Sequence, residues 1–329
     1  MGQPIQIRVI GKELTERLLR IDDVLSAVDE TFQALGRGQI FHPVKEPIWL
    51  GEGGANMLLA MPAHLKEKHI VGVKWVNMYP IQQPGLPASY GNLLILSHEE
   101  NGQPYALLEA TAITAMRTAG GHAVVAARYL ARKDARTLAV IGCGAEAQAG
   151  VRSFLHAMPG LEEVRLFDLR PEAMQTIQDQ VGRRARVCCC RSAQEAVEPA
   201  DIVVTVTTAT KPIVQFDWLK KGAFVAGLYS FNDLDPACSR RADKWFLGSR
   251  ETDGVQIVHA PRMAQYHLRD EDVAGDLGEV AAGLCPGRES EDEIIVYTHM
   301  GMGALDAAVG DVLFRRAEEA GLGMVIDLA

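Results

Sequence analysis

The chain has 329 residues, of which 48% are hydrophobic and 23% charged, and its formal net charge is −9. This length exceeds what one hydrophobic core usually supports, so we expect two domains, and the composition excludes a disordered chain. The negative charge argues against a nucleic-acid partner, because nucleic-acid binders present clustered Lys and Arg to phosphates. The N-terminal segment lacks a signal-peptide core and no stretch reaches the ~20 apolar residues of a membrane span, so we expect a cytoplasmic protein without membrane association.

The first third of the chain predicts one amphipathic helix followed by a sheet. Val24, Val28 and Phe32 recur at four-residue spacing, and Gly36 can end that helix. Apolar runs separated by Gly- and Pro-rich turns then predict the strands of an antiparallel or mixed sheet, at residues 47–50, 56–62, 70–77, 92–97 and 105–109.

Residues 111–130 predict a long Ala-rich helix, with Thr111 as its N-cap and Gly120 and Gly121 as an interruption. We interpret this helix as the connection between two domains. Beyond it, apolar strands alternate with helices that begin at Ala145 and Pro171. Such alternation is typical of a parallel sheet with helices on both faces.

The segment LAVIGCGAEAQ is typical of a dinucleotide-binding turn, because its glycines stand directly after an apolar strand and before a helix. Gly142 permits the tight turn, Gly144 lets the backbone approach a pyrophosphate, and Ala147 lets the helix pack closely. The amides of the helix start, at Ala145 and Gln148, then face the paired phosphates.

Asp168 supports this interpretation, because it ends the next predicted strand and can accept hydrogen bonds from an adenosine ribose. A carboxylate there favours NAD, while Arg170 keeps NADP open as the cofactor, since a guanidinium can accept a 2′-phosphate. Thr207 and Thr208 end a further strand and are expected beside the cofactor. The alternative is a turn that only closes a βαβ unit.

Three consecutive cysteines, Cys188 to Cys190, lie on a predicted strand, where neighbouring side chains point to opposite faces. No CxxC pair or His cluster at ligand spacing accompanies them. We therefore interpret them as reduced thiols and predict no metal site.

Several charged residues are candidates for chemistry. Lys74 lies inside the apolar run IVGVKWVN, and Arg117 is a lone cation in a weakly polar helix. A buried lysine is a candidate acid or base near neutrality, and a guanidinium can clamp a carboxylate; each can equally be a structural ion pair. Lys45 is a weaker candidate. His299 and Asp306 flank the Gly-rich turn THMGMG, where a core histidine and a helix-start aspartate are the structural alternatives.

The motifs HPVK, GVKWVNMYP, EATAITAMRTAGGHA, IGCGAEAQ, FDLRP, ADIVVTVTTATKPIV and GMGALDAAVGD occur in this order along nearly the whole chain. This pattern resembles the ornithine cyclodeaminase/μ-crystallin family. The resemblance implies an α/β fold in which a Rossmann-type doubly wound parallel sheet, residues 118–308, is inserted into an α+β substrate-binding and dimerisation domain, residues 1–117 plus 309–329. It also implies a homodimer.

The resemblance implies roles for individual residues. Lys74 would contact the substrate carboxylate or the reacting carbonyl or imine, and Arg117 would bind the carboxylate; Lys45 would share in that binding. The family commonly has an arginine where this chain has Lys45, so a point charge replaces a planar fork. We also expect substrate contacts from Tyr229 and His299, and from the loop 80–90.

A second departure concerns an aspartate that cyclodeaminases and alanine dehydrogenases of the family carry shortly after the strand AFVAGL. Here Gly227, Leu228 or Tyr229 stands in that place, and Asp233 aligns with the acidic residue that starts the next helix. In a cyclodeaminase this carboxylate would act as general base and position the attacking amine. Its loss favours plain hydride transfer over ornithine cyclisation.

Three functions follow from the resemblance. The leading hypothesis is an NAD(P)-dependent oxidoreductase that acts on an α-amino or α-imino acid. The second is ornithine cyclodeaminase, which forms proline and ammonia with recycled NAD. The third is a non-catalytic protein that binds a small ligand together with NAD(P).

Overall fold

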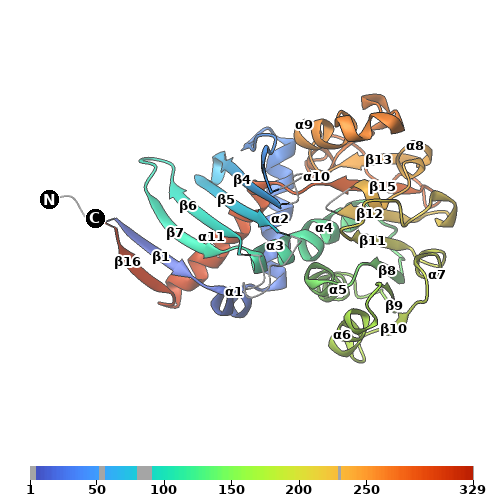
Figure 1. Ribbon diagram of the computed structural model, residues 1–329, viewed down its shortest axis with the longest axis horizontal. Helices are drawn as coiled ribbons and strands as arrows, with labels where there is room; N and C mark the ends of the chain where they lie inside the picture. The colour runs from blue at the N-terminus through green and yellow to red at the C-terminus, as the bar shows by residue number, and fades with distance from the viewer. Residues whose placement is uncertain (1–4, 52–55, 80–90, 229–230, 329) are drawn as a thin grey trace. The chain divides into compact units, whose positions relative to one another are not determined.

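The computed structural model describes residues 5–51, 56–79, 91–228 and 231–328. The chain divides into two compact units, the first made of Met1–Ala34, Gly38–Arg117 and Met302–Ala329, the second of Leu35–Arg37 and Thr118–Gly301 (Figure 1). In the described ranges, no helix is long and apolar enough to cross a bilayer. The chain returns to the first unit at Met302, just before the last helix begins at Gly303. The boundary expected from the sequence, 308/309, lies within that helix.

The first unit contains one mixed sheet. Its strands are β1 (Gln6–Ile10), β2 (Ile40–Phe41), β3 (Pro47–Leu50), β4 (Asn56–Leu65), β5 (Ile70–Met78), β6 (Leu93–His98), β7 (Pro104–Glu109) and β16 (Met324–Asp327). They lie in the order β16-β1-β7-β6-β5-β4-β2, with β3 beside β4. β1 and β7 are parallel, and the remaining pairs are antiparallel. The sheet brings the two ends of the chain together, because Gln6 pairs with Asp327.

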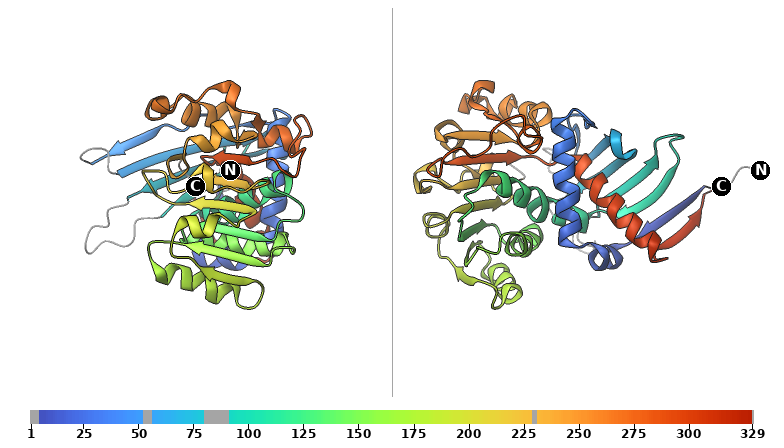
Figure 2. Two further views of the ribbon diagram at one scale, coloured as in Figure 1. Left: turned by 90° about the vertical axis from the view of Figure 1, so that its right-hand side faces the viewer. Right: turned by 180° about the vertical axis from the view of Figure 1, so that it is seen from behind.

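The helices of the first unit are α1 (Lys12–Leu18), α2 (Ile21–Gly36), α3 (Thr111–Arg117) and α11 (Gly303–Glu319). Val24, Val28 and Phe32 are buried on α2, as their spacing predicted. α11 lies across one face of the sheet and contacts β4, β5 and β6 (Figure 2). A side chain at Gly303 would meet the carbonyl oxygen of Met61 at 2.4 Å, so a glycine lets the start of α11 approach β4 closely.

The second unit is a doubly wound parallel sheet in the order β10-β9-β8-β11-β12-β15-β13-β14. Its strands are β8 (Thr137–Ile141), β9 (Glu163–Phe167), β10 (Arg186–Cys189), β11 (Ile202–Val206), β12 (Phe224–Leu228), β13 (Lys244–Leu247), β14 (Gly275–Asp276) and β15 (Ile295–His299). Its α-helices are α4 (Ala123–Leu130), α5 (Ala145–Ala157), α6 (Pro171–Val181), α7 (Ala193–Val197), α8 (Ala237–Arg241), α9 (Arg250–Asp253) and α10 (Leu277–Ala281). The strands β10-β9-β8-β11-β12 have the order 3-2-1-4-5 of a Rossmann sheet, and β15 takes the sixth position; this confirms the predicted fold class.

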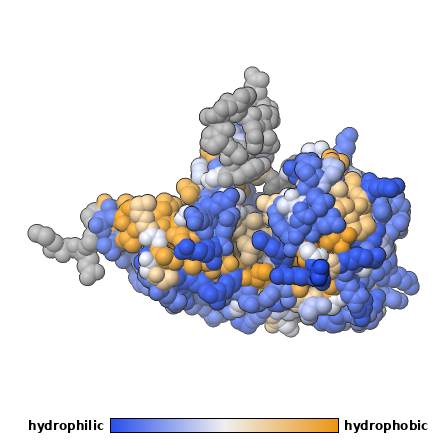
Figure 3. Space-filling model, turned by 90° about the horizontal axis from the view of Figure 1, so that it is seen from below, coloured by the Kyte–Doolittle hydropathy of each residue, from blue (hydrophilic) through white to orange (hydrophobic). Residues whose placement is uncertain are grey.

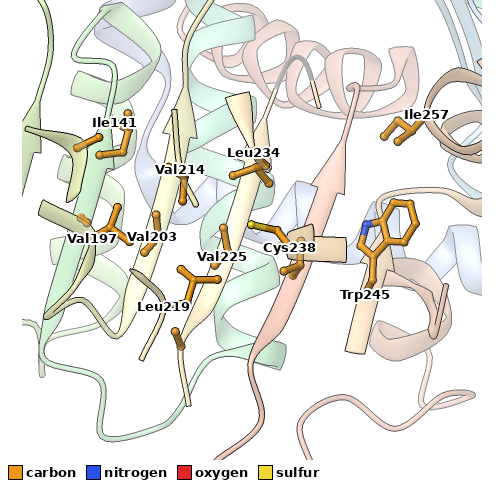
Figure 4. Close-up of a cluster of buried hydrophobic side chains, with 14 of the residues drawn as sticks. Ile141, Val197, Val203, Val214, Leu219, Val225, Leu234, Cys238, Trp245 and Ile257 are labelled. Atoms are coloured by element: carbon orange, nitrogen blue, oxygen red, sulfur yellow. The ribbon is translucent and has the colours of Figure 1, made fainter. Parts of the chain in front are cut away.

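One face of this sheet carries a continuous apolar core. Side chains from β8, β11, β12 and β13 meet those of α7 and the segments that follow β11 and β13 (Figure 4). Val203, Val225 and Trp245 are buried within it. The strands thus read as apolar runs without alternation because both of their faces are covered.

The predicted helix over 111–130 is three segments in the structure. α3 ends at Arg117, a π-helical turn spans Thr118–His122, and α4 follows. The small residues of the turn pack on α5, since a Cβ at Gly150 would lie 2.8 Å from that of Ala119. Close approach of α5 therefore explains the glycines that the sequence showed as an interruption.

Candidate active site

Lys74, Arg117 and Asp306 form a buried ion cluster in the first unit. Lys74 Nζ donates to Asp306 Oδ1 at 2.9 Å, and Arg117 Nε donates to the same oxygen at 3.1 Å. Lys74 Nζ also donates to Thr114 Oγ1 at 2.8 Å. The side chains are 2%, 6% and 0% exposed for Lys74, Arg117 and Asp306. The lone cation of the apolar strand and the lone cation of the Ala-rich helix thus meet at one carboxylate.

The fold of the first unit explains this meeting. Lys74 lies in the middle of β5, paired to Met61 on β4 and to Leu94 on β6. Arg117 is the last residue of α3, and Asp306 lies in the first turn of α11. Gly72 lies on the same face of β5 as Lys74, and its Cβ would be 3.3 Å from that of Ala307. α11 therefore sits close enough to β5 for its first turn to reach the lysine.

Asp306 is the anion of this cluster. Burial raises the pKa of Asp306, but Arg117 and Lys74 outweigh it and hold the pKa below its ordinary value. Lys74 and Arg117 therefore share one oxygen of an ionised carboxylate. Two buried cationic side chains placed next to each other can also hold the carboxylate of a ligand.

The second unit carries the predicted dinucleotide-binding turn at the end of β8. Gly142 has a φ of +89°, and a Cβ there would lie 2.3 Å from the carbonyl oxygen of Val206. Gly144 is the N-cap of α5, and its Cβ would meet nothing within 4 Å. Ala147 is buried in the first turns of α5. The turn thus requires glycine at one position and leaves open space at the next, as a turn that approaches a phosphate does.

Asp168 follows β9 and holds this turn. Its Oδ2 accepts from the backbone N–H of Cys143 at 2.7 Å, and its Oδ1 accepts from that of Arg170 at 2.8 Å. Burial raises the pKa of Asp168, but these amides and the Arg170 guanidinium outweigh it and lower the pKa. The carboxylate is therefore ionised and oriented, with Arg170 largely exposed beside it.

At the end of β11, the Thr207 side chain is held by Asp233. The sequence indicated Asp233 only as the acidic residue at the start of a later helix. Thr207 Oγ1 donates to Asp233 Oδ2 at 3.1 Å, and Asp233 is fully buried. Burial raises the pKa of Asp233 to about 7, although the hydroxyls of Thr205 and Thr207 oppose this. Thr208, the next residue, is exposed.

His299 ends β15 and belongs to a buried polar network of the second unit. Its Nδ1 lies 2.7 Å from Asp253 Oδ2, and neither side chain is exposed. The centroid of its ring lies 4.7 Å from the centroid of the His122 ring, and Tyr297 Oη lies 3.3 Å from His122 Nδ1. In the described structure, the ring therefore lies among buried polar side chains. The role of His299 as a substrate ligand stays a prediction.

Of the other predicted substrate residues, Lys45 lies within the described ranges and the rest lie outside them. Lys45 is half-buried on the connection between β2 and β3. Tyr229 and the loop 80–90 lie outside the residues that the structure describes. Within the dinucleotide-binding turn, Ala145 is exposed at the start of α5, and the Gln148 side chain accepts from Gln180 at 3.0 Å.

With this geometry in view, comparison with known proteins identifies the family. The model of the ornithine cyclodeaminase/mu-crystallin family matches residues 9–321. The chain belongs to the ornithine cyclodeaminase/mu-crystallin family. It is 32% identical to the alanine dehydrogenase of Archaeoglobus fulgidus, across 97% of each protein. It is 28% identical to a Delta(1)-pyrroline-2-carboxylate reductase of Bacillus cereus, across 97% of this chain and 99% of the reductase.

Solved structures of ornithine cyclodeaminase/mu-crystallin family members have the same fold. An archaeal alanine dehydrogenase dimer with bound NAD superposes with a TM-score of 0.88 at 29% identity, over 98% of this chain and 100% of the other. The Delta(1)-pyrroline-2-carboxylate reductase of Thermococcus litoralis, in complex with NADH and L-proline, gives a TM-score of 0.88 at 28% identity, over 97% and 99% of the two chains. These matches confirm the resemblance found in the sequence.

Proposed function

We propose that this member of the ornithine cyclodeaminase/mu-crystallin family is an NAD-dependent oxidoreductase that acts on an α-amino or α-imino acid. The observation that carries the proposal is the buried Lys74–Asp306–Arg117 cluster, whose two cationic side chains lie next to each other and suit an amino-acid carboxylate. The alanine dehydrogenase and the pyrroline-2-carboxylate reductase to which it is similar both act on such acids, as their names state.

The residues of the β8 turn fit a nicotinamide dinucleotide. Gly142 and Gly144 would let the backbone approach the paired phosphates, and the start of α5 would supply N–H groups to them. Asp168 would accept from the ribose hydroxyls while its other bonds hold the turn. Its ionised carboxylate favours NAD over NADP, and the exposed Arg170 is the group that would have to accommodate a 2′-phosphate.

In the proposed mechanism, Arg117 binds the substrate carboxylate and Lys74 polarises the carbonyl or imine. When bound, the nicotinamide supplies or accepts the hydride at the substrate Cα. Lys74 Nζ already donates to Thr114 and Asp306, so its position is fixed before substrate arrives. Such preorganised donors lower the barrier more than flexible ones, because they need no rearrangement in the transition state.

The proposal is tested by following nicotinamide absorbance with a panel of amino acids, and with 2-oxo acids plus ammonia or amines. Lys74→Ala should lower turnover by about 10²- to 10⁴-fold, the usual contribution of a positioned acid or base. Lys66→Ala is the matched control, since Lys66 is an exposed lysine of the same unit. An unchanged turnover in Lys74→Ala would remove Lys74 from the mechanism.

Ornithine cyclodeaminase is the second candidate, because it would use the same cofactor turn. Its distinguishing result is ammonia release from ornithine without net NADH formation. The chain has Gly227 and Leu228 at the end of β12, where the family's aspartate is expected nearby, and this disfavours cyclisation. A non-catalytic binding role, the third candidate, predicts bound NAD with no turnover of any substrate in the panel.

We also propose that the chain forms a homodimer through its first unit. Lys74, Leu94 and Leu96 face α11, so the alternation of β5 and β6 places Trp75 and Leu93 on the opposite face, where both are exposed and paired in register. Apolar surface gathers on the first unit, at the left of Figure 3. The archaeal alanine dehydrogenase is itself described as a dimer. Trp75→Glu should therefore shift the mass in sedimentation equilibrium from two chains toward one.

A further inference from the structure

The thiols of the three consecutive cysteines separate onto two faces of β10 and its continuation. Cys189 Sγ lies 3.7 Å from Gln178 Oε1, on the side of α6. Cys188 and Cys190 point to the other face, where their sulfur atoms lie 3.7 Å apart. The alternation of the strand thus turns a run of three cysteines into one pair and one separate thiol.

A third possible ligand, the carboxylate of Glu195, lies near the pair on α7. A carboxylate oxygen of Glu195 and the two sulfur atoms all lie within 4.8 Å of one another. The carboxylate is anchored, since Glu195 Oε2 accepts from the backbone N–H of Arg191 at 2.8 Å. Its residue is also held at the helix start, because Ser192 Oγ accepts from the Glu195 N–H at 3.1 Å. The sequence alone did not show this ligand, because a CxC pair with a Glu five residues later is not a familiar metal spacing.

We propose that Cys188, Cys190 and Glu195 form a binding site for one thiophilic divalent cation of the Zn²⁺ class. In a tetrahedral site with Zn–S bonds of about 2.3 Å, two sulfur ligands are separated by roughly 3.8 Å. The observed separation of 3.7 Å already has this value. The fourth position is left to water, because Cys188 is half-buried and Glu195 is exposed.

A guanidinium lies beside the site. Arg165 Nη2 donates to the Glu195 carbonyl oxygen at 2.9 Å, while its Nη1 pairs with Glu163 at 2.6 Å. Two thiolates and one carboxylate would leave a bound divalent cation with one negative charge in excess. Because thiols bind such a cation only as thiolates, coordination releases protons and affinity should rise with pH.

A disulfide between Cys188 and Cys190 fits the same geometry less well. Residues two apart on a strand have Cα atoms about 6.6 Å apart, from a rise of about 3.3 Å per residue. Disulfides prefer Cα separations of about 5.5–6 Å, so the strand would have to contract. Cys190 N–H donates to Leu166 O at 2.8 Å, and this bond to β9 resists the contraction. A cation requires no such movement.

The test uses the full-length protein, reduced with a phosphine and freed of metal. Cd²⁺ is titrated while the ultraviolet thiolate-to-cadmium charge-transfer band is recorded, and Zn²⁺ binding is measured by calorimetry. We expect one cation per chain. Cys188→Ser and Cys190→Ser should each weaken binding by more than about tenfold, and Glu195→Gln should weaken it less, because a carboxylate is the weaker ligand for a soft cation.

Cys189→Ser is the matched control, because it removes a neighbouring thiol that faces α6. It should leave both the stoichiometry and the affinity unchanged. Cys188→Ser keeps the test valid if Cys190→Ser fails to fold, since Cys188 is the less buried of the pair. Absence of saturable binding overturns the proposal. So does an equal loss in Cys189→Ser, or peroxide oxidation of the pair to a disulfide in a protein that binds no Cd²⁺.

Discussion

Each unit of the molecule buries a carboxylate beside titratable groups, but the two carboxylates are satisfied differently. In the first unit, Asp306 accepts from Lys74 and Arg117 through one oxygen. In the second, Asp253 Oδ2 lies 2.7 Å from His299 Nδ1 and also accepts from the N–H of Gly248 at 3.0 Å. Backbone donors thus surround the second carboxylate, whereas two cationic side chains hold the first.

This difference separates a cluster suited to binding from one suited to holding structure. Backbone N–H groups of Gly248, Ser249 and Met300 tie Asp253 to the main chain, as in a structural network. Asp306 is instead held by two cationic side chains, which we propose also bind a substrate carboxylate. The two clusters should therefore respond differently when their acids are neutralised.

The largest expected effect comes from Asp306→Asn. It leaves two buried cations without their anion, and the free energy of unfolding should fall by about 3–5 kcal/mol. Denaturant unfolding measures the loss. Glu319→Gln is the control, because Glu319 is an exposed acid in the last turn of the same helix; its loss should stay within about 0.5 kcal/mol. Equal losses in both variants would contradict the cluster as described.

Asp253→Asn should lower the free energy of unfolding by less, about 1–3 kcal/mol, which is the penalty for leaving buried donors poorly paired. The amide oxygen can still accept from Gly248 or Ser249, while its NH₂ group faces a former donor. Chemical denaturation of both acid variants side by side gives the comparison directly. If Asp253→Asn proves the more damaging of the two, the contrast between the units is wrong.

Arg117→Lys tests whether the cluster at Asp306 binds the substrate carboxylate. A lysine can keep the ion pair with Asp306 but cannot form a bidentate contact with a substrate carboxylate. We expect KM to rise by roughly tenfold, equivalent to about 1.4 kcal/mol, with a smaller change in kcat. Arg316→Lys, an exchange at an arginine that pairs with Asp23, should leave KM unchanged. A loss confined to kcat would assign Arg117 to the chemical step.

Asp233 supplies the smallest expected effect, a change in pH dependence. Its pKa is raised to about 7 in the folded chain against an ordinary value of 3.8. The folded state therefore holds the proton more tightly, so this stabilisation is complete below pH 3.8 and is lost as the pH rises through about 7. Between pH 5 and pH 8, the melting temperature of Asp233→Asn should therefore change by a few degrees less than that of the unaltered protein. A slope equal to that of the unaltered protein would show that Asp233 does not titrate there.

Local sequence was sufficient where each element carries its own pattern. The 47–50 strand was predicted at the bounds it has, and the alternation after residue 137 correctly predicted a parallel sheet. β1 and β16 were missed, because each is short and is stabilised by pairing with the opposite end of the chain. The sequence predicted a single helix over 111–130, whereas its centre is a π-helical turn. This turn packs closely on α5, a contact that the local sequence does not show.

The sequence by itself determined the dinucleotide-binding turn, because a strand, two glycines and a helix start are contiguous and their physics is local. It also marked Lys74 and Arg117, because a cation in an apolar run must find a partner or water. Only the tertiary structure decided that the partner is Asp306, which lies 232 residues from Lys74 along the chain. Long-range pairing of this kind follows from how α11 packs on β5, and no local pattern encodes it.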